Sequence, residues 1–543
     1  MFVPRRAGSR STRLPNRAYH GHFSSTDGRL WKRKLDGLED FVTTIYNAAA
    51  GFGHGALQFE VKPTKQLESD SIILESTRKA WIRLRLSAPM IALRTDSEPG
   101  SHGDAFFISY ECPKSSATIV SKWAGETLKW HPEQKTLAER DLDLKDLWWG
   151  PGDNHWIMEM HVGRLDGNIQ LILMATHWAL DGTIGVLLAD RILEYLVAEL
   201  EGRAENVEEL PWGKEIVQLP PSMAAVSAPQ YRGEVAPPPP QMDGIQNFFH
   251  RPVYSKDPTH STSHTTLSHP VKLTAVQTQA FRDNCKAHGF TVTPALNAIL
   301  VLADVETALK TGKRKGTDAL REVHQSFLPS ADGFFIPVNG VNRRSAFLPL
   351  AEHASLDSPL GTPGMAAEAF PTVHDMNAIR KCIRVDGNMK IERVMSQDAF
   401  WNGAVMNAHE VLAPGKPTPP RSLANQKALN AALASCTLEV VQSGILSTSI
   451  GDFDNANNLA RWKPSNRDSG EGPALTIENM ILSARITQPT VMCCSWRYDG
   501  QLTMPIHGAR EFHDEHAWQD FADAVETETF FPSRQVLLSD DYH

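Results

Sequence analysis

Three observations predict a mixed α/β protein built from two comparable domains. The chain has 543 residues, of which 41% are hydrophobic, and a core of that size normally divides into two or more domains. Apolar residues recur at both helical and strand spacing in each half. A segment with eight prolines between Pro211 and Pro240 separates the halves, since so many missing amide donors exclude regular helix or central strand.

Helical spacing of apolar residues opens the first half, at Leu35, Leu38, Phe41, Val42 and Ile45. This spacing predicts a helix within residues 30–52. Further helices are expected over 70–86 and 182–202, the latter ended by Gly202. Strands are expected over residues 56–61, 104–112, 155–162 and 168–176.

A helix pair over residues 272–289 and 291–310 is expected to open the second half, with caps at Thr274 and Thr293. Residues 396–440 are expected to be mostly helical. Residues 333–347 are expected to be a strand and a loop, and strands are expected over 444–453, 475–484 and 490–509. A helix over 514–528 closes the chain. The last strand segment contains "YDGQL", which is typical of a hairpin turn.

These elements suggest four segments along the chain. They are a basic flexible arm over 1–30, an N-terminal domain over 31–210, a proline-rich crossover over 211–270 and a C-terminal domain over 271–543. The first 25 residues hold five arginines and no acidic residue, which fits either a flexible arm or an organellar presequence. No apolar run approaches the ~18 to 20 residues that span a bilayer.

The charge, cysteine and histidine patterns limit the classes of partner, cellular compartment and metal site that the sequence supports. The net charge of −9 and the absence of a long single-sign block argue against nucleic acid. Six cysteines are scattered without a C-x-x-C pair, so we expect reduced thiols and a cytoplasmic protein. No metal site is expected, because the histidines of "PTHSTSHTTLSH" are irregularly spaced in a serine- and threonine-rich stretch.

His177 and Asp181 stand where an apolar strand pattern gives way to a helix pattern, in "ATHWALDGTIG". At such a junction an imidazole can face a cleft and accept a proton near pH 7. The alternative for His177 is a satisfied core histidine. The alternative for Asp181 is an N-cap of the helix that follows.

Three segments resemble the chloramphenicol acetyltransferase-like superfamily, which includes BAHD acyltransferases and peptide condensation domains. They are "HWALDG" as its H-x-x-x-D-G, "PVNGVNRRSAFLPL" as its arginine-bearing segment, and "GILSTSIGDFD" as its late strand. The resemblance covers residues 35–530, and "WKRKLDGLEDFV", "HWALDGTIG" and "LSTSIGDFD" look most like the fungal trichothecene 15-O-acetyltransferases. It implies two chloramphenicol acetyltransferase-like domains with mixed sheets flanked by helices and an active-site tunnel between them.

The resemblance also implies roles for individual residues. His177 would be the general base, and Asp181, followed by Gly182, would turn from the substrate to pair with Arg343 or Arg344. The alternative for these two arginines is solvated loop charge. Ser447, Thr448 and Ser449 would lie near the oxyanion; strand alternation puts Ser447 and Ser449 on one face and Thr448 on the other, and hydroxyls bonded to backbone are the alternative for each.

Two departures from the superfamily pattern matter. Peptide condensation domains carry a second histidine where this chain has Thr176, which favours an alcohol acceptor. The segment "GDFDNANN" keeps Asp452 but loses most of the plant-type D-F-G-W-G, which puts a role for Asp452 in doubt.

Two further motifs concern phosphate. Lys313, Arg314 and Lys315 lie in a predicted glycine-bounded loop and are either CoA phosphate contacts or a solvated turn. The segment "GFGHGA" imitates a dinucleotide fingerprint, but it follows a helix pattern instead of a strand, so we reject that interpretation.

The resemblance predicts acetyl transfer from acetyl-CoA to a hydroxyl of a trichothecene-type sesquiterpenoid in secondary metabolism, by a direct ternary complex. We expect a monomer that uses acetyl-CoA as a co-substrate and holds no permanent cofactor. The alternatives are acylation of another secondary-metabolite alcohol or amine, and a catalytically silent acyl-binding protein.

Overall fold

The computed structural model describes residues 22–65, 67, 69–98, 105–113, 117–179, 181–227, 264–328, 333–344, 364–415, 444–456, 458–469 and 474–539. The basic arm over its first 21 residues, Pro237–Pro240, Cys436 and the expected helical stretch 416–440 lie outside these ranges.

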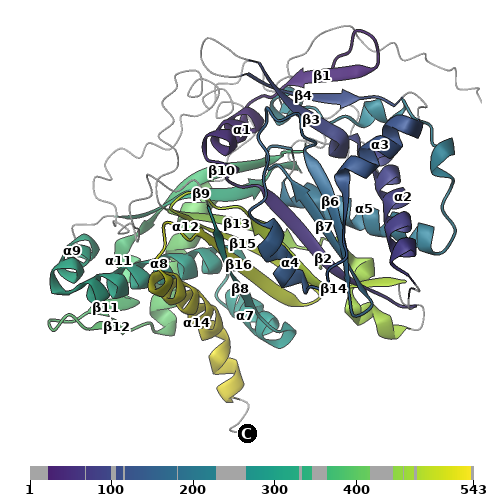
Figure 1. Ribbon diagram of the computed structural model, residues 1–543. Helices are drawn as coiled ribbons and strands as arrows, with labels where there is room; N and C mark the ends of the chain where they lie inside the picture. The colour runs from purple at the N-terminus through teal and green to yellow at the C-terminus, as the bar shows by residue number, and fades with distance from the viewer. Residues whose placement is uncertain are drawn as a thin grey trace, which may run out of the picture.

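Two mixed sheets dominate the architecture (Figure 1). The first has the strand order β14 (Leu475–Ala484), β2 (Gly55–Pro63), β7 (Asn168–Ala175), β6 (Met158–Leu165) and β5 (Leu128–His131). The second has the order β10 (Ala367–Asp375), β9 (Gly333–Asn342), β13 (Gly444–Asp452), β15 (Thr490–Tyr498), β16 (Gln501–Ala509) and β8 (Thr266–Lys272). Each sheet contains parallel and antiparallel pairs, as the predicted fold class requires.

Two smaller sheets lie beside them. One consists of β1 (Leu30–Lys34), β4 (Ala105–Glu111) and β3 (Leu93–Glu98), and the other of β11 (Ile383–Val385) and β12 (Ile391–Arg393). The helices of the first half are α1 (Leu38–Ala48), α2 (Asp70–Ser87), α3 (Ala117–Thr127), α4 (Leu137–Leu144), α5 (Gly182–Leu200) and α6 (Met223–Ser227). Those of the second half are α7 (Ala275–Ala287), α8 (Val292–Lys315), α9 (Thr317–Phe327), α11 (Met376–Arg380), a π-helical turn (Ala399–Val405), α12 (Met406–Gly415) and α14 (Glu515–Ser539).

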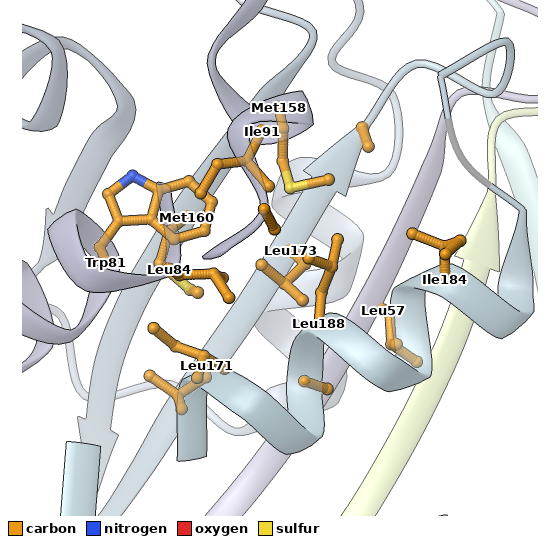
Figure 2. Packing of buried hydrophobic residues seen from close by; sticks show 14 of the residues in the cluster. Leu57, Trp81, Leu84, Ile91, Met158, Met160, Leu171, Leu173, Ile184 and Leu188 are labelled. Carbon is orange, nitrogen blue, oxygen red and sulfur yellow. The ribbon is translucent and has the colours of Figure 1, made fainter. Parts of the chain in front are cut away.

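The first lobe forms around the five-stranded sheet, with α2 and α5 on one face. Figure 2 shows Trp81 and Leu84 of α2 packed toward Leu171 and Leu173 of β7, with Leu188 of α5 beside them. All are buried, as the continuous apolar run of β7 and the helical spacing along α5 predict.

The second lobe is centred on α8, which packs under the six-stranded sheet next to α14. Among the described residues α8 is long and apolar enough by length and composition to cross a bilayer, but 89% of its most apolar window is buried inside the protein. It is the central core helix of this lobe.

The strand β14 crosses between the lobes. It comes from the second half of the chain but pairs antiparallel with β2 at the edge of the first sheet. The predicted C-terminal domain, 271–543, is therefore wrong in one respect, because residues 475–484 complete the other lobe.

Two local predictions also change. The predicted first helix is strand β1 up to Lys34, because this segment pairs with β4 far along the chain, and Gly37 at φ 60° precedes α1. Thr274 caps α7 as predicted, but α8 follows Thr291 and not Thr293. The strand of the expected strand and loop over 333–347 is β9, which ends at Asn342.

Candidate active site

His177 lies in the turn between β7 and α5, with its side chain exposed. Its neighbours Thr176 and Trp178 are buried, and the Trp178 indole donates to Thr95 Oγ1 at 3.1 Å. The turn therefore directs the imidazole outward between two anchored residues. A satisfied core histidine does not fit this placement.

His177 lines a cavity of about 310 Å³ between the two lobes. The first lobe contributes Leu57, Leu173 and Ala175, and the second contributes Val338, Leu446 and Met492. The volume suits a small organic ligand, and a mainly apolar wall with few polar groups is usual for such sites.

Asp181 both caps α5 and forms an ion pair. Its Oδ1 accepts the backbone amides of Thr183 and Ile184 at 3.1 and 3.2 Å, and its Oδ2 accepts the amide of Ala366 at 2.9 Å. Nη1 of Arg344 lies 2.7 Å from each carboxylate oxygen. The two interpretations of Asp181, as cap and as ion-pair partner, are thus compatible.

Arg344 and Arg343 are not equivalent. Arg344 is 5% exposed and also donates to the carbonyl of Gly364 at 2.9 Å, whereas Nε of Arg343 lies 3.8 Å from Glu368. The partner of Asp181 is therefore Arg344, and this pair ties the His177 loop to the second lobe.

Gly182 marks a close contact between the lobes. A Cβ added here would lie 3.1 Å from Cγ2 of Ile450 on β13. The glycine of the H-x-x-x-D-G segment thus lets the start of α5 approach β13.

The hydroxyls of β13 divide between its two faces. Ile445 and Cys493 pack into the second-lobe core, whereas Cys494 packs into the first-lobe core with Ile450 against it. Ser447 is in register with Cys493 and Thr448 with Cys494. Since neighbouring residues in register share a face, Thr448 faces the first lobe and the cavity.

Ser447 faces α8 instead. Nδ2 of Asn297, a buried residue of α8, donates to Ser447 Oγ at 3.3 Å. Ser447, Thr448 and Ser449 all border the cavity, and Ser449 is exposed. By orientation, Thr448 is the hydroxyl best placed to reach a ligand.

Gly53 was not anticipated from the sequence. It lies in the turn between α1 and β2 at φ 82°, and a Cβ added there would lie 3.5 Å from Cδ2 of His177. Its amide donates to the carbonyl of Arg485 at 2.8 Å. The "GFGHGA" segment is thus a helix-to-strand turn against the imidazole, which agrees with rejecting a dinucleotide site.

His54 of the same turn lies away from solvent and outside the cavity lining. Its Nδ1 is 2.8 Å from the hydroxyl of Tyr46, and burial lowers its pKa to about 3. It is a neutral structural group.

Lys313, Arg314 and Lys315 form the last turn of α8, so the predicted loop is wrong. Gly312 lies within α8, and its missing side chain lets the backbone of α9 approach, since a Cβ added there would lie 3.1 Å from Cα of Leu320. Arg314 pairs with Asp520, and none of the three basic residues borders the cavity. Their contact with a CoA phosphate stays a prediction.

The remaining candidates have structural partners. The Thr176 hydroxyl lies 3.5 Å from the Ile157 carbonyl, and Asp452 pairs with Arg497 at 3.1 Å. Within the described ranges, five buried cysteines form no disulfide bond: Cys112, Cys285, Cys382, Cys493 and Cys494. Among the described residues, no group of three histidine, cysteine or acidic side chains has metal-binding geometry.

Comparison with known proteins gives structural neighbours only. No family model and no curated protein matches the sequence. The chain is similar in structure to TRI3 trichothecene 15-O-acetyltransferase from Fusarium sporotrichioides, with TM-score 0.69 and 14% identity over 96% of this chain and 99% of that one.

Two other solved structures are similar at lower scores. Polyketide synthase associated protein 5 from Mycobacterium tuberculosis has TM-score 0.52 and 15% identity, over 93% of this chain and 98% of that one. The condensation domain of the Monacolin K polyketide synthase MokA has TM-score 0.51 and 9% identity, over 94% and 98%. The protein therefore has the two-domain chloramphenicol acetyltransferase-like fold, with mixed sheets flanked by helices.

Proposed function

We propose that the protein is an acyltransferase that moves the acetyl group of acetyl-CoA to a hydroxyl of an apolar small molecule, with His177 as general base. The observation that carries the proposal is the outward imidazole in a cavity between the lobes, on a loop fixed by Asp181 and Arg344. The fold shared with TRI3 trichothecene 15-O-acetyltransferase supports it.

The proposed reaction needs no covalent enzyme intermediate. Neutral His177 takes the hydroxyl proton while the oxygen attacks the thioester carbonyl, and the carbonyl becomes a tetrahedral oxyanion. When the oxyanion collapses, the carbon–sulfur bond breaks and the imidazolium returns the proton to the thiolate. Such a base contributes ~10² to 10⁴ in rate.

Thr448 is the proposed oxyanion donor. Its side chain is on the face of β13 that borders the cavity. A hydrogen bond donated from there to the carbonyl oxygen becomes stronger as negative charge develops on that oxygen. The Asp181–Arg344 pair would fix the loop that carries the imidazole, and Gly53 would limit the space beside the ring, since a Cβ added there would lie 3.5 Å from Cδ2.

The proposed acceptor is a trichothecene-type sesquiterpenoid acetylated at its 15-hydroxyl. The fold neighbour that acts on such a compound and the apolar cavity wall support this choice. Thr176, in the position of a second histidine, favours an alcohol over an amine.

A thiol-release assay tests the proposal. The full chain is incubated with acetyl-CoA and a panel of terpenoid alcohols that includes 15-hydroxy trichothecenes, with amines as comparison acceptors. Release of free CoA that depends on an alcohol is expected, and His177→Ala should lower its rate at least ~10²-fold. His516→Ala, which removes an exposed histidine on α14, is the matched control.

The possible outcomes test the general base, the class of acceptor and catalysis itself. Turnover that survives in His177→Ala removes the general-base role. Turnover with amines alone reassigns the acceptor, and acceptor binding without thiol release identifies a silent binding protein.

A further inference from the structure

Helix α1 presents an apolar face to the cavity, at the edge of the first-lobe core. Leu38, Phe41, Val42 and Ile45 border the cavity at i, i+3, i+4 and i+7 spacing. The first three are only half-buried. Val42 also packs against the first-lobe core and Ile45 is buried. The stripe therefore lies where the core meets the cavity, with the half-buried side chains open to a ligand.

The neighbouring face of α1 is buried and carries two polar side chains. Glu39, 3% exposed, receives two hydrogen bonds from the Arg33 guanidinium at 2.6 and 2.7 Å. Thr43 is fully buried one turn later and donates to the Glu39 carbonyl at 2.7 Å. Rotating the helix to bury its apolar stripe would break this buried ion pair, so the orientation is fixed.

The end of α1 is also fixed, beside His177. Arg485 Nε donates to the Ala50 carbonyl at 2.9 Å, and Thr487 donates to the carbonyl of Ala49. The turn then reaches Gly53, which lies against the imidazole. The apolar stripe of α1 therefore has a set position relative to His177.

The cavity offers no charge to an ionic ligand. Among the described residues that line it there is no lysine or arginine, and its carboxylates, Asp181 and Glu368, face Arg344 and Arg343. A phosphate or carboxylate placed there would lose its hydration without a compensating cation. The occupant of this part of the cavity is therefore neutral.

The length of the stripe sets the size of the occupant. Ile45 lies seven positions after Leu38, which is about 10 Å along a helix axis. An acetyl group is too short to cover that distance.

We infer that α1 is the specificity wall for the acceptor, whose neutral, fused-ring-sized apolar body lies along Leu38, Phe41, Val42 and Ile45 with its hydroxyl toward His177. This inference rests on the proposed acyl transfer. The acceptor inferred in this way carries no formal charge and is selected mainly by its apolar surface.

Binding of the neutral apolar dye Nile red to the full chain tests the wall without turnover. We expect saturable binding that is at least ~10-fold weaker in Phe41→Ala. Removing the phenyl ring takes away apolar contact with the dye, and losing even one methylene contact in an apolar pocket weakens binding about 10-fold or more. Val42→Thr keeps shape and fold while adding a hydroxyl and should also weaken binding. Asn47→Ala, at an exposed position near the end of the same helix, should bind like the wild type.

Acceptor kinetics test the selectivity. Phe41→Ala should raise the KM for a terpenoid alcohol at least ~10-fold and leave the KM for acetyl-CoA unchanged. An equal rise for both substrates, or equal Nile red binding by Phe41→Ala and Asn47→Ala, overturns the inference. Nile red binding that depends on Phe41, without any thiol release, refutes the acyl transfer but still supports α1 as the apolar wall of a binding site.

Discussion

The side chain of Thr448 occupies the space that a Cβ of Gly340 would need. The two residues are in register on the parallel strands β13 and β9, and a Cβ added at Gly340 would lie 2.6 Å from Thr448 Oγ1. Both residues border the cavity. The absent side chain at Gly340 therefore decides where the Thr448 hydroxyl lies.

Replacing Thr448 with valine keeps the shape and removes the hydroxyl. We expect kcat to fall ~10² to 10³-fold, the usual loss for one oxyanion donor, while Thr448→Ser keeps most activity. Ser447→Ala is the matched control, because its hydroxyl faces α8, and it should change kcat less than ~10-fold. Equal losses in Thr448→Val and Ser447→Ala would contradict the assignment.

Gly340→Ala should act through Thr448. The added methyl must displace the hydroxyl, so kcat is expected to approach that of Thr448→Val, with a loss of ~1 to 3 kcal/mol in unfolding free energy from overpacking. A double-mutant cycle checks the route. In a Thr448→Ala background Gly340→Ala should have little further effect on kcat, and additive losses would argue for an independent role.

Arg344→Leu should destabilise the protein by about 3 kcal/mol or more, because it leaves the buried Asp181 carboxylate without its cation. Urea denaturation followed by circular dichroism measures the change. The comparison is Arg321→Ala, which breaks an exposed pair with Asp318 and should cost under ~1 kcal/mol. Similar costs for both variants would mean that the buried pair is not a structural anchor.

Gly53→Ala should lower activity more than stability. A side chain at φ 82° costs about 1 kcal/mol in the left-handed region, and relief of that strain would move the turn that contacts His177. We expect a fall in kcat of ~10-fold or more with normal folding. Gly289→Ala, also at positive φ but with open space around its Cβ, is the control and should leave kcat unchanged.

His507 should make the protein sensitive to acid. Burial lowers the pKa of His507 to about 4, and its ring nitrogens contact Ser268 Oγ at 3.0 Å and the Leu482 carbonyl at 3.1 Å. The unfolded chain binds this proton near pH 6.5 and the folded chain only near pH 4, so stability falls as the pH drops through that window. The loss from this group is about 3 kcal/mol.

Unfolding free energies of wild type and His507→Gln, measured between pH 7 and 4, test this. The glutamine variant should start less stable and lose less on acidification, so the difference between the two should shrink by up to about 3 kcal/mol. The buried His54 and His374 remain in both proteins and cancel in the comparison. A constant difference across the window would exclude His507 as the source.

Local sequence patterns were sufficient to predict those structural features that depend only on neighbouring residues in the chain. The 444–453 and 475–484 strands, the Asp499–Gly500 hairpin and the α5 cap at Asp181 follow from alternation, turn residues and capping chemistry. Alternation also separated Thr448 from Ser447 correctly. The alternation does not predict which face of β13 borders the cavity, because this depends on which face packs against α8.

Other features depend on distant contacts and left no local signal. The choice of Arg344 over Arg343 is set by how the end of β9 meets Gly364 and Asp181, and the two arginines are adjacent in the same sequence context. Strand β1 resembled a helix because its pairing with β4 is long-range. The contact of Gly53 with His177 needed a full fold to be seen.

The position of β14 has a consequence for how the protein is made and divided. A fragment that stops at residue 227 lacks the edge strand of its own sheet and leaves β2 with an unpaired edge, which favours aggregation. During synthesis, the first lobe is incomplete until residue 484 has emerged, so it cannot finish folding ahead of the second. Cleavage of the backbone between residues 227 and 264 should leave both pieces associated, held by the pairing of β14 with β2.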